Sequence, residues 1–236
     1  MRKTIVIIMA LFAIISCHKK NNKNLHLTGN IKGLRKGTLY IQKIVDTNLV
    51  ALDSIKIDGN SNFESDLDIK SPEMYYLFLD RGVTNSKDNN ILFFAEPGKI
   101  NIETTLDNFI NNARITGSKN NNLYQEYREV VSRFNDETLM LTQAKFKAYK
   151  DRNTKLSDSI IEKQNANTKR RYLYAVNFAI NHSDYEVSPY IALTDIYDVN
   201  LKYMDTIQKA MTPKVSKSLY GKKLTSLLAE RIKAEK

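Results

Sequence analysis

The hydrophobic pattern of this chain changes its period once, close to residue 119, and this change constrains the fold more than any other feature. Before it, apolar residues such as Leu25 and Leu27 alternate with polar ones, which places them on one face of a strand. After it, apolar residues recur at helical spacing. We therefore expect an α+β protein, with an N-terminal antiparallel β-sandwich or barrel over residues 25–118 and a C-terminal all-helical domain over residues 119–236.

Local signals refine both halves. Asp58-Gly59-Asn60 lies between two strand-like runs and predicts a β-hairpin. Met74–Leu79 is a continuous apolar run, which is typical of a strand buried on both faces. In the second half, a helical region is expected over about residues 145–181 with a break near Asn153. Ser188-Pro189 is a helix-start signal, in which Ser caps the helix and Pro takes its first position.

The first residues are typical of an export signal. Arg2 and Lys3 precede an apolar run that ends at Ile15, which is too short to span a bilayer as a helix. We expect residues 1–16 to be a signal peptide and the polar, basic residues 17–24 to be a flexible tether.

Cys17 follows a small residue at the end of this run and resembles the acylated cysteine of the bacterial lipobox. The alternative is an ordinary secretory signal with an unrelated cysteine, which would leave an exported protein with one odd thiol. Because Cys17 is the only cysteine of the chain, its lipidation would exclude internal disulfides, a Cys-x-x-Cys redox site, a cysteine nucleophile and thiolate metal sites.

The net charge of +10 is unevenly distributed. The first 24 residues carry +5, residues 25–118 carry −2 and residues 119–236 carry +7, which favours two domains of different character. The basic half lacks a glycine-rich loop and an RNA-binding aromatic signature, so we expect no nucleic-acid partner. Attraction to anionic lipid headgroups and a simply solvated basic surface are the two remaining interpretations.

Several segments together resemble a known family: LHLTGNIKGLRKGTLYIQKI, LDSIKIDGNSNFESDL, MYYLFL, ILFFAEPGKINIE and ARITGSKNNNLYQEY. They are similar to the N-terminal domain of unknown function of many Bacteroidota lipoproteins, which usually precedes a thioredoxin-like module of the TlpA or thiol-peroxidase type. The resemblance covers residues 25–120 well and residues 171–230 loosely. Such a module would begin near Lys236, and no cysteine pair is present in this chain, so no thiol chemistry and no catalytic residue carries over.

The remaining titratable residues point to no metal or catalytic site. His18, His26 and His182 are scattered without metal-ligand spacing, so we expect no metal and no cofactor. Glu64, Asp66 and Asp68 alternate with apolar residues and are interpreted as the wet side of a strand. Asp195, Asp198 and Asp205 are interpreted as an exposed helix face, and neither set predicts a cleft with paired catalytic carboxylates.

Two kinds of surface site stay open. The 13 tyrosines permit a glycan-binding interpretation, although most lie within apolar patterns and are more simply core or half-core residues. Ser54, Ser159 and Thr206 each stand in an Asp-Ser/Thr-Ile sequence that resembles the acceptor of Bacteroidota O-glycosylation.

These observations favour a membrane-anchored envelope lipoprotein that acts as a non-enzymatic binding or scaffold module. The residues after Cys17 are basic, whereas surface-exported relatives carry an acidic signal there, so we expect a periplasm-facing protein on the outer or inner membrane. One alternative is a detached partner module of a separate thioredoxin-like thiol-disulfide oxidoreductase. The other is a glycan-binding or hydrolytic envelope protein.

Overall fold

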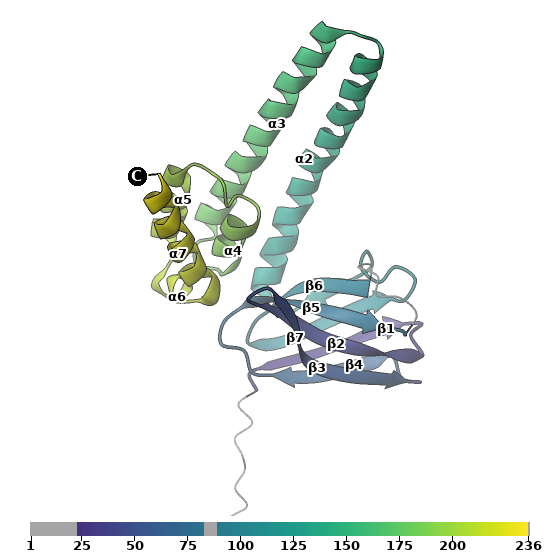
Figure 1. Ribbon diagram of the computed structural model, residues 1–236. Coiled ribbons are helices and arrows are strands. Elements are labelled where there is room, and N and C mark those ends of the chain that lie inside the picture. Colours follow the sequence, from purple (N-terminus) through teal and green to yellow (C-terminus); the bar gives the residue numbers. More distant parts are fainter. Residues whose placement is uncertain (1–22, 83–88, 236) are drawn as a thin grey trace, which may run out of the picture.

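The computed structural model describes residues 23–82 and 89–235 and shows a strand-rich part from which a long helical hairpin rises (Figure 1). The predicted signal peptide, Cys17 and His18 lie outside the described residues. The strands are β1 (Leu25–Lys32), β2 (Lys36–Val45), β3 (Asn48–Asp58), β4 (Asn62–Leu67), β5 (Glu73–Asp80), β6 (Asn90–Ala95), β7 (Gly98–Thr105) and β8 (Arg114–Thr116).

These strands form two four-stranded sheets, in the orders β4-β1-β7-β8 and β3-β2-β5-β6. Their facing side chains form one apolar core, to which all strands but the short β8 contribute a buried residue. The predicted α+β class is therefore confirmed, as a β-sandwich and not as a closed barrel. All pairs are antiparallel except β1 and β7, which run parallel.

Strand β1 shows why the alternating pattern predicts its faces correctly. Leu25, Leu27 and Ile31 are buried between the sheets, and the polar residues His26, Thr28 and Asn30 are half-exposed. At Gly29, a β-carbon would collide with the carbonyl oxygen of Ile102 on β7 and with the ring of Phe63, so the ring and the neighbouring strand occupy the space that a larger residue would need. Because Phe63 pairs with Gly29, the contact fixes the register of β4 on β1.

The hairpin predicted at Asp58-Gly59-Asn60 is wrong in its pairing. The chain does turn there, with Gly59 at a φ of 89°. However, β3 pairs with β2 and β4 pairs with β1, so the turn carries the chain from one sheet to the other. Local turn chemistry was correct, and the tertiary pairing of Phe63 with Gly29 decided the partner.

The helices are α2 (Lys119–Lys150), α3 (Thr154–Asn181), α4 (Val187–Thr194), α5 (Leu201–Ala210), α6 (Pro213–Ser216) and α7 (Leu219–Ala234). The hydroxyl of Ser118 accepts a hydrogen bond from the Asn121 N–H and caps α2. Helix α2 runs without interruption to Lys150, so the helical region expected from about residue 145 begins within it. The predicted break near Asn153 is confirmed, because Asn153 caps α3.

One predicted helix start is wrong. Helix α4 begins at Val187 with Glu186 as its cap, two residues earlier than Ser188-Pro189 implies. The Ser188 hydroxyl instead donates to the carbonyl oxygen of Ala179 at 2.7 Å, which ties α4 to the end of α3. A long-range hydrogen bond therefore uses the side chain that the local pattern assigned to capping.

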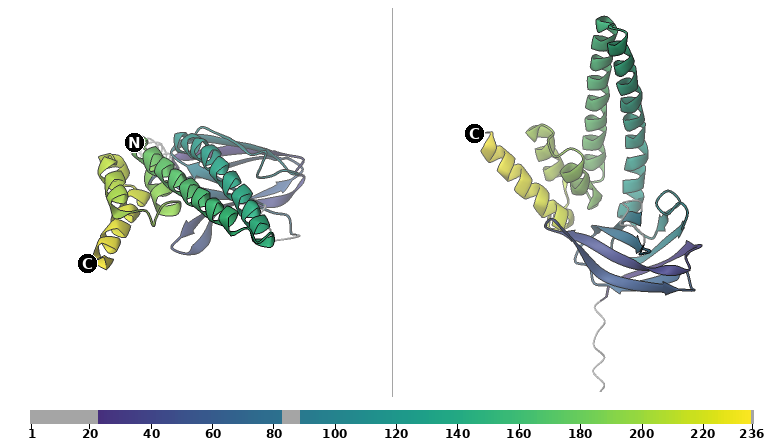
Figure 2. Two further views of the ribbon diagram at one scale, coloured as in Figure 1. Left: turned by 90° about the horizontal axis from the view of Figure 1, so that it is seen from above. Right: turned by 45° about the vertical axis from the view of Figure 1, so that its right-hand side comes forward.

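The short helices gather at the base of the hairpin. Helices α4 and α5 pack on the lower part of α3, and α7 packs on α4, α5 and α6, whereas the far ends of α2 and α3 stand clear of the other elements (Figure 2). The buried residues of the helical core lie on the lower halves of α2 and α3, on the short helices and on two strands of the sandwich. The buried residues of the two cores all fall within residues 25–228 of the sequence.

Candidate binding pocket

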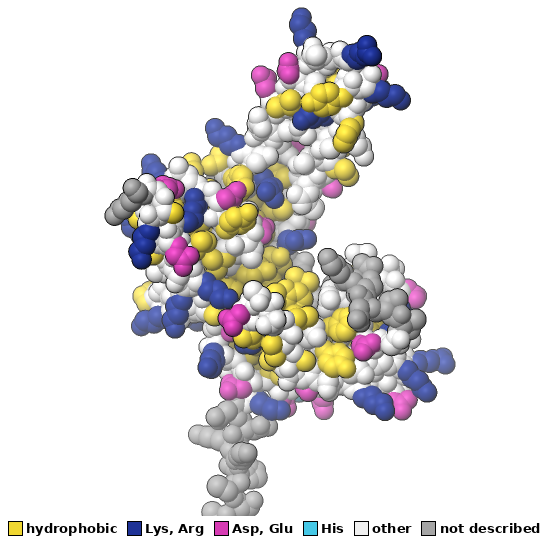
Figure 3. Space-filling model, in the orientation of Figure 1, with side chains coloured by type: hydrophobic (Ala, Val, Ile, Leu, Met, Phe, Trp, Pro, Cys, Tyr) yellow, Lys and Arg dark blue, Asp and Glu magenta, His cyan; other side chains and the backbone are white. Residues whose placement is uncertain are grey.

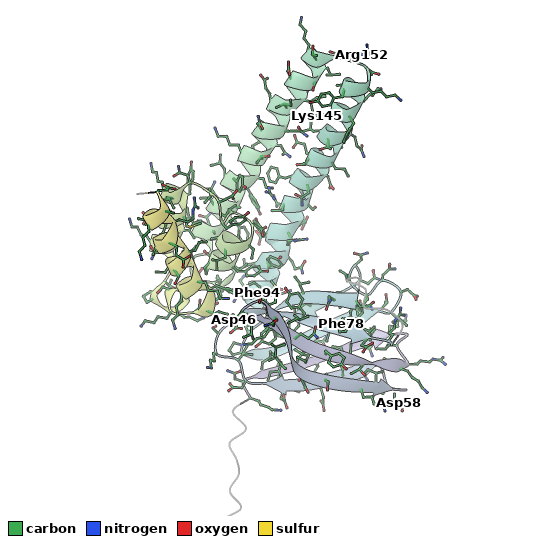
Figure 4. The ribbon with its side chains drawn as sticks, viewed as in Figure 1. Asp46, Asp58, Phe78, Phe94, Lys145 and Arg152 are labelled. Atoms are coloured by element: carbon green, nitrogen blue, oxygen red, sulfur yellow. The ribbon has the colours of Figure 1, made fainter. Side chains whose placement is uncertain are left out.

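The two parts of the molecule meet at an aromatic junction around Phe94, which follows Phe93 on β6. Phe93 belongs to the sandwich core. Phe94 belongs to the helical core and lies at the edge of the sandwich next to the helices (Figure 4). The ring of Phe94 meets Tyr190 edge-on at 5.3 Å between centroids and Tyr220 at 6.1 Å. Burial raises the pKa of both tyrosines well above the ordinary value, so these phenols stay protonated. A strand residue is thus part of the helical core.

A buried hydrogen-bond network reinforces this junction. The side-chain amide of Asn120, in the first turn of α2, donates to Glu96 at 2.7 Å and to Glu186 at 3.1 Å. Its oxygen accepts the N–H of Val187 at 2.9 Å. Glu186 is only 1% exposed, so its carboxylate is compensated by the hydrogen bond from Asn120 and by Lys214, whose Nζ lies 3.7 Å from Oε1 of Glu186. The contacts fix the bases of α2 and α4 against the end of β6.

A pocket of about 400 Å³ opens between α3 and the segment that joins α4 to α5. Val176 is buried at this pocket, and the exposed residues Leu173 and Tyr203 also line it. The Tyr172 hydroxyl donates to both carboxylate oxygens of Asp198, at 3.0 and 3.1 Å. Burial and this carboxylate raise the pKa of Tyr172, which therefore remains a hydrogen-bond donor. The remaining lining residues are Asn165, Thr168, Lys169, Val199 and Asn200.

The chemistry of this pocket is suited to binding. It offers two phenol rings and aliphatic side chains for apolar contact, with amide and hydroxyl groups beside them. Its lining contains one carboxylate, whose two oxygens share the single proton that the Tyr172 hydroxyl donates, and one ammonium group. General acid–base catalysis by a pair of carboxylates or by a histidine would need groups that this lining does not contain.

The acidic residues near this pocket are arranged differently from the expectation. Asp195, Asp198 and Asp205 do not share one exposed helix face. Asp195 ends α4 and accepts a hydrogen bond from the Tyr127 hydroxyl at 2.9 Å, and Asp198 lies in the following connection. Asp205 pairs with Lys209 on α5. The chain turns between α4 and α5, so a constant helical period does not apply across these positions.

The predicted surface sites are dispersed. Ser54 is exposed in β3 and pairs with Tyr40, Ser159 is exposed on α3, and Thr206 is exposed on α5. The Thr206 hydroxyl donates to the carbonyl oxygen of Lys202 at 2.8 Å. These three positions lie on three separate elements, and none of them lines the pocket.

The histidines and the strand carboxylates also stay apart from the pocket. His26 pairs with Asp66 at 2.7 Å on the outer face of the sandwich, and His182 lies against the ring of Phe178. The solvent-exposed face predicted for Glu64, Asp66 and Asp68 is confirmed, because all three are exposed, the first two on β4 and Asp68 directly after it. Within residues 23–82 and 89–235, no group of three or more His, Cys, Asp or Glu side chains is arranged to hold a metal ion.

The sequence pattern did not identify the pocket. Its residues come from the middle of α3 and from positions 198–203, and they become neighbours only when α5 folds back against α3. The nearest signal was the set of tyrosines with helical spacing, which was interpreted mainly as core. Tyr172 fits that interpretation in part, whereas Tyr203 is 40% exposed.

Comparison with known proteins finds a similarity for one part of this chain. Residues 25–124 match the family model described as a domain of unknown function, DUF4369. The DUF4369 region thus covers the sandwich and the first six residues of α2, which include Asn120 of the junction. No curated protein and no solved structure matches the chain. Among the described residues, no helix is both long and apolar enough to cross a bilayer.

Proposed function

We propose that this protein is an envelope lipoprotein, anchored through acylated Cys17, that acts as a non-enzymatic binding or scaffold module. The observation that carries the binding role is the pocket between α3 and α5, which combines phenol rings, aliphatic side chains and amides. We expect the pocket to receive an apolar or aromatic side chain of a partner protein, because such groups match its exposed Leu173 and Tyr203.

The junction supports a scaffold role. Phe94, Asn120 and Tyr220 connect the sandwich to the helices through buried aromatic and polar contacts. A partner bound at the pocket would therefore be held in a defined position relative to the DUF4369 region. A module that positions a partner needs such a fixed connection between its parts.

The test is in-cell crosslinking of the full chain, followed by affinity purification and mass spectrometry. We expect a reproducible partner whose recovery falls at least about tenfold when Leu173 and Tyr203 are both replaced by serine. Tyr197→Ser is the matched control, because Tyr197 is also exposed and lies outside the pocket. Equal recovery from the pocket variant and the control would refute binding at this pocket. An N-terminal peptide without acylated Cys17 would refute the anchor.

A second candidate is a detached partner module of a separate thioredoxin-like oxidoreductase. Its support is the match of residues 25–124 to DUF4369 together with the resemblance to lipoproteins in which this kind of domain precedes a thioredoxin-like module. It predicts that the recovered partner contains a Cys-x-x-Cys motif. Recovery of transport or cell-wall components without any thiol protein would favour the free-standing scaffold.

Glycan binding is the remaining alternative, and the pocket tyrosines support it because aromatic rings stack on sugar faces. It predicts that soluble envelope glycans quench or shift the tyrosine signals of the purified protein and that the Leu173 and Tyr203 double variant loses this response.

The proposed orientation toward the periplasm predicts that external protease leaves the protein intact in whole cells and cleaves it after the outer membrane is opened.

A further inference from the structure

The far end of the helical hairpin, residues 139–156, carries apolar side chains that no other part of the described chain covers. Phe146 is 72% exposed and Met140 is 63% exposed, and Leu139, Tyr149 and Leu156 are also exposed. This hairpin tip stands away from the sandwich and the short helices (Figure 1). Such a cluster of large exposed apolar residues on a soluble surface marks an interaction site.

The apolar residues occupy a wide face of α2. Ala148 is buried against α3, and helical geometry of about 100° per residue places Leu139 on the opposite side of α2. From Tyr149 through Phe146 and Leu139 to Met140, the exposed side chains span roughly half of the helix circumference. Leu156 adds an exposed apolar side chain from α3. This face is wider than the apolar stripe, about 100° or somewhat more, that an amphipathic helix usually turns toward a protein core.

The hairpin tip is also basic. Lys145 and Arg152 lie at this end of the hairpin (Figure 4), and side chains of Lys and Arg, with some of Asp and Glu, stand among and beside the apolar ones there (Figure 3). Residues 138–158 contain five basic residues, Lys145, Lys147, Lys150, Arg152 and Lys155, and two acidic ones, Asp151 and Asp158. None of the five forms an ion pair with another described residue. Tip-to-tip pairing of two copies would therefore bring like charges together.

We propose that the hairpin tip docks into the headgroup region of an anionic phospholipid bilayer. The unpaired cations complement the negative headgroups, and the apolar side chains enter the boundary with the acyl chains. Lipids of a fluid bilayer can contact the protruding end of the two helices on all sides. A groove on an acidic partner protein would cover only one face of it. This contact is separate from acylation of Cys17, and it would give the protein a second membrane attachment.

The chain contains no tryptophan, so Phe146→Trp introduces a single fluorescent reporter at the hairpin tip. The test uses a chain that begins at Lys23, which keeps every residue of both cores and has no acylation site. With vesicles of phosphatidylglycerol and phosphatidylethanolamine, we expect the emission to shift to the blue and brominated acyl chains to quench it. Vesicles of phosphatidylcholine alone should give little response.

Tyr197→Trp is the matched reporter control, because Tyr197 is exposed and aromatic but lies outside the hairpin tip. Lys147→Glu with Lys150→Glu should weaken binding to the anionic vesicles by at least about tenfold. The same charge change at Lys222 and Lys223, which are exposed on α7, should change it less than about twofold. All these positions are at the surface, so circular dichroism should show an unchanged fold.

The proposal is overturned if Phe146→Trp gives no shift with anionic vesicles or if the two reporters respond equally. It is also overturned if a photoreactive amino acid in place of Leu139 attaches in cells to a protein and not to lipid. The shortened protein that begins at Lys23 lacks Cys17, so a negative vesicle result would not count against the proposed lipid anchor. Absence of acylation at Cys17 would likewise not change the vesicle result.

Discussion

Replacing Phe94 by alanine should separate the stability of the helical part from that of the sandwich. Phe94 is fully buried and meets the three rings of Tyr124, Tyr190 and Tyr220 edge-on. Truncation of a buried phenylalanine costs about 3–5 kcal/mol, and each lost aromatic pair is worth about 0.5–1.5 kcal/mol beyond its buried area. Because these contributions overlap, we expect a loss of about 4 kcal/mol, or roughly 8–16 °C in Tm for a protein of this size.

The neighbouring residue provides the control. Phe93 is equally buried on the same strand, but its side chain belongs to the sandwich core. Phe93→Ala should lower the free energy of unfolding by a similar amount. The two variants should differ in which part of the molecule is destabilised. Native-state hydrogen exchange is the assay.

In Phe94→Ala, protection should fall first in α4 and α7, whereas in Phe93→Ala it should fall first in β5 and β6. A Phe94→Ala variant that costs less than about 1 kcal/mol, or that lowers protection evenly over both parts, would refute the assignment of Phe94 to the helical core.

Other variants test the remaining contacts. Asn120→Ala should cost about 2–3 kcal/mol in urea unfolding, because it leaves a buried carboxylate without its hydrogen-bond donor, while exposed Asn122→Ala should stay within about 0.5 kcal/mol. Gly117→Ala should cost more than about 3 kcal/mol, because its new carbon would lie 1.9 Å from a backbone oxygen of β7. Gly59→Ala has the same left-handed strain but open space, and it should cost about 1–2 kcal/mol. Equal losses at the two glycines would contradict the crowding argument. Burial raises the pKa of Tyr190 above its ordinary value of 10.0, so its contribution to stability is complete below about pH 10 and is lost as the pH rises further. Thermal unfolding at increasing alkaline pH should therefore show a falling Tm, and a constant Tm would contradict this expectation.

Elements with a strong local period were predicted well. The alternation in β1 gave the correct buried face, and the break at Asn153 gave the correct end of the hairpin. Met74–Leu79 was predicted to be buried on both faces, and the structure confirms this where Met74 enters the helical core and Tyr75 enters the sandwich core. Farther along β5, Phe78 is only half-buried, because no helix covers that end of the strand.

The errors share a different cause. Asp58-Gly59-Asn60 was assigned a hairpin and Ser188 was assigned a cap, and in both cases a partner distant in sequence determined the outcome. The pocket between α3 and α5 was missed for the same reason. Its two sides are each unremarkable as sequence, and only their juxtaposition makes a binding surface.

The sequence by itself determined where strands give way to helices, which face of each strand is apolar and that the chain has a single cysteine, because these properties follow from local spacing and residue identity. Tertiary structure alone decided that β4 pairs with β1, that Phe94 belongs to the helical core and that the end of the hairpin stays uncovered. Such outcomes depend on contacts across the chain, as between Met74 and Tyr220, which are 146 residues apart. Contacts of that range leave no periodic signal, since the free energy that selects them comes from packing and from the hydrogen bonds of buried groups.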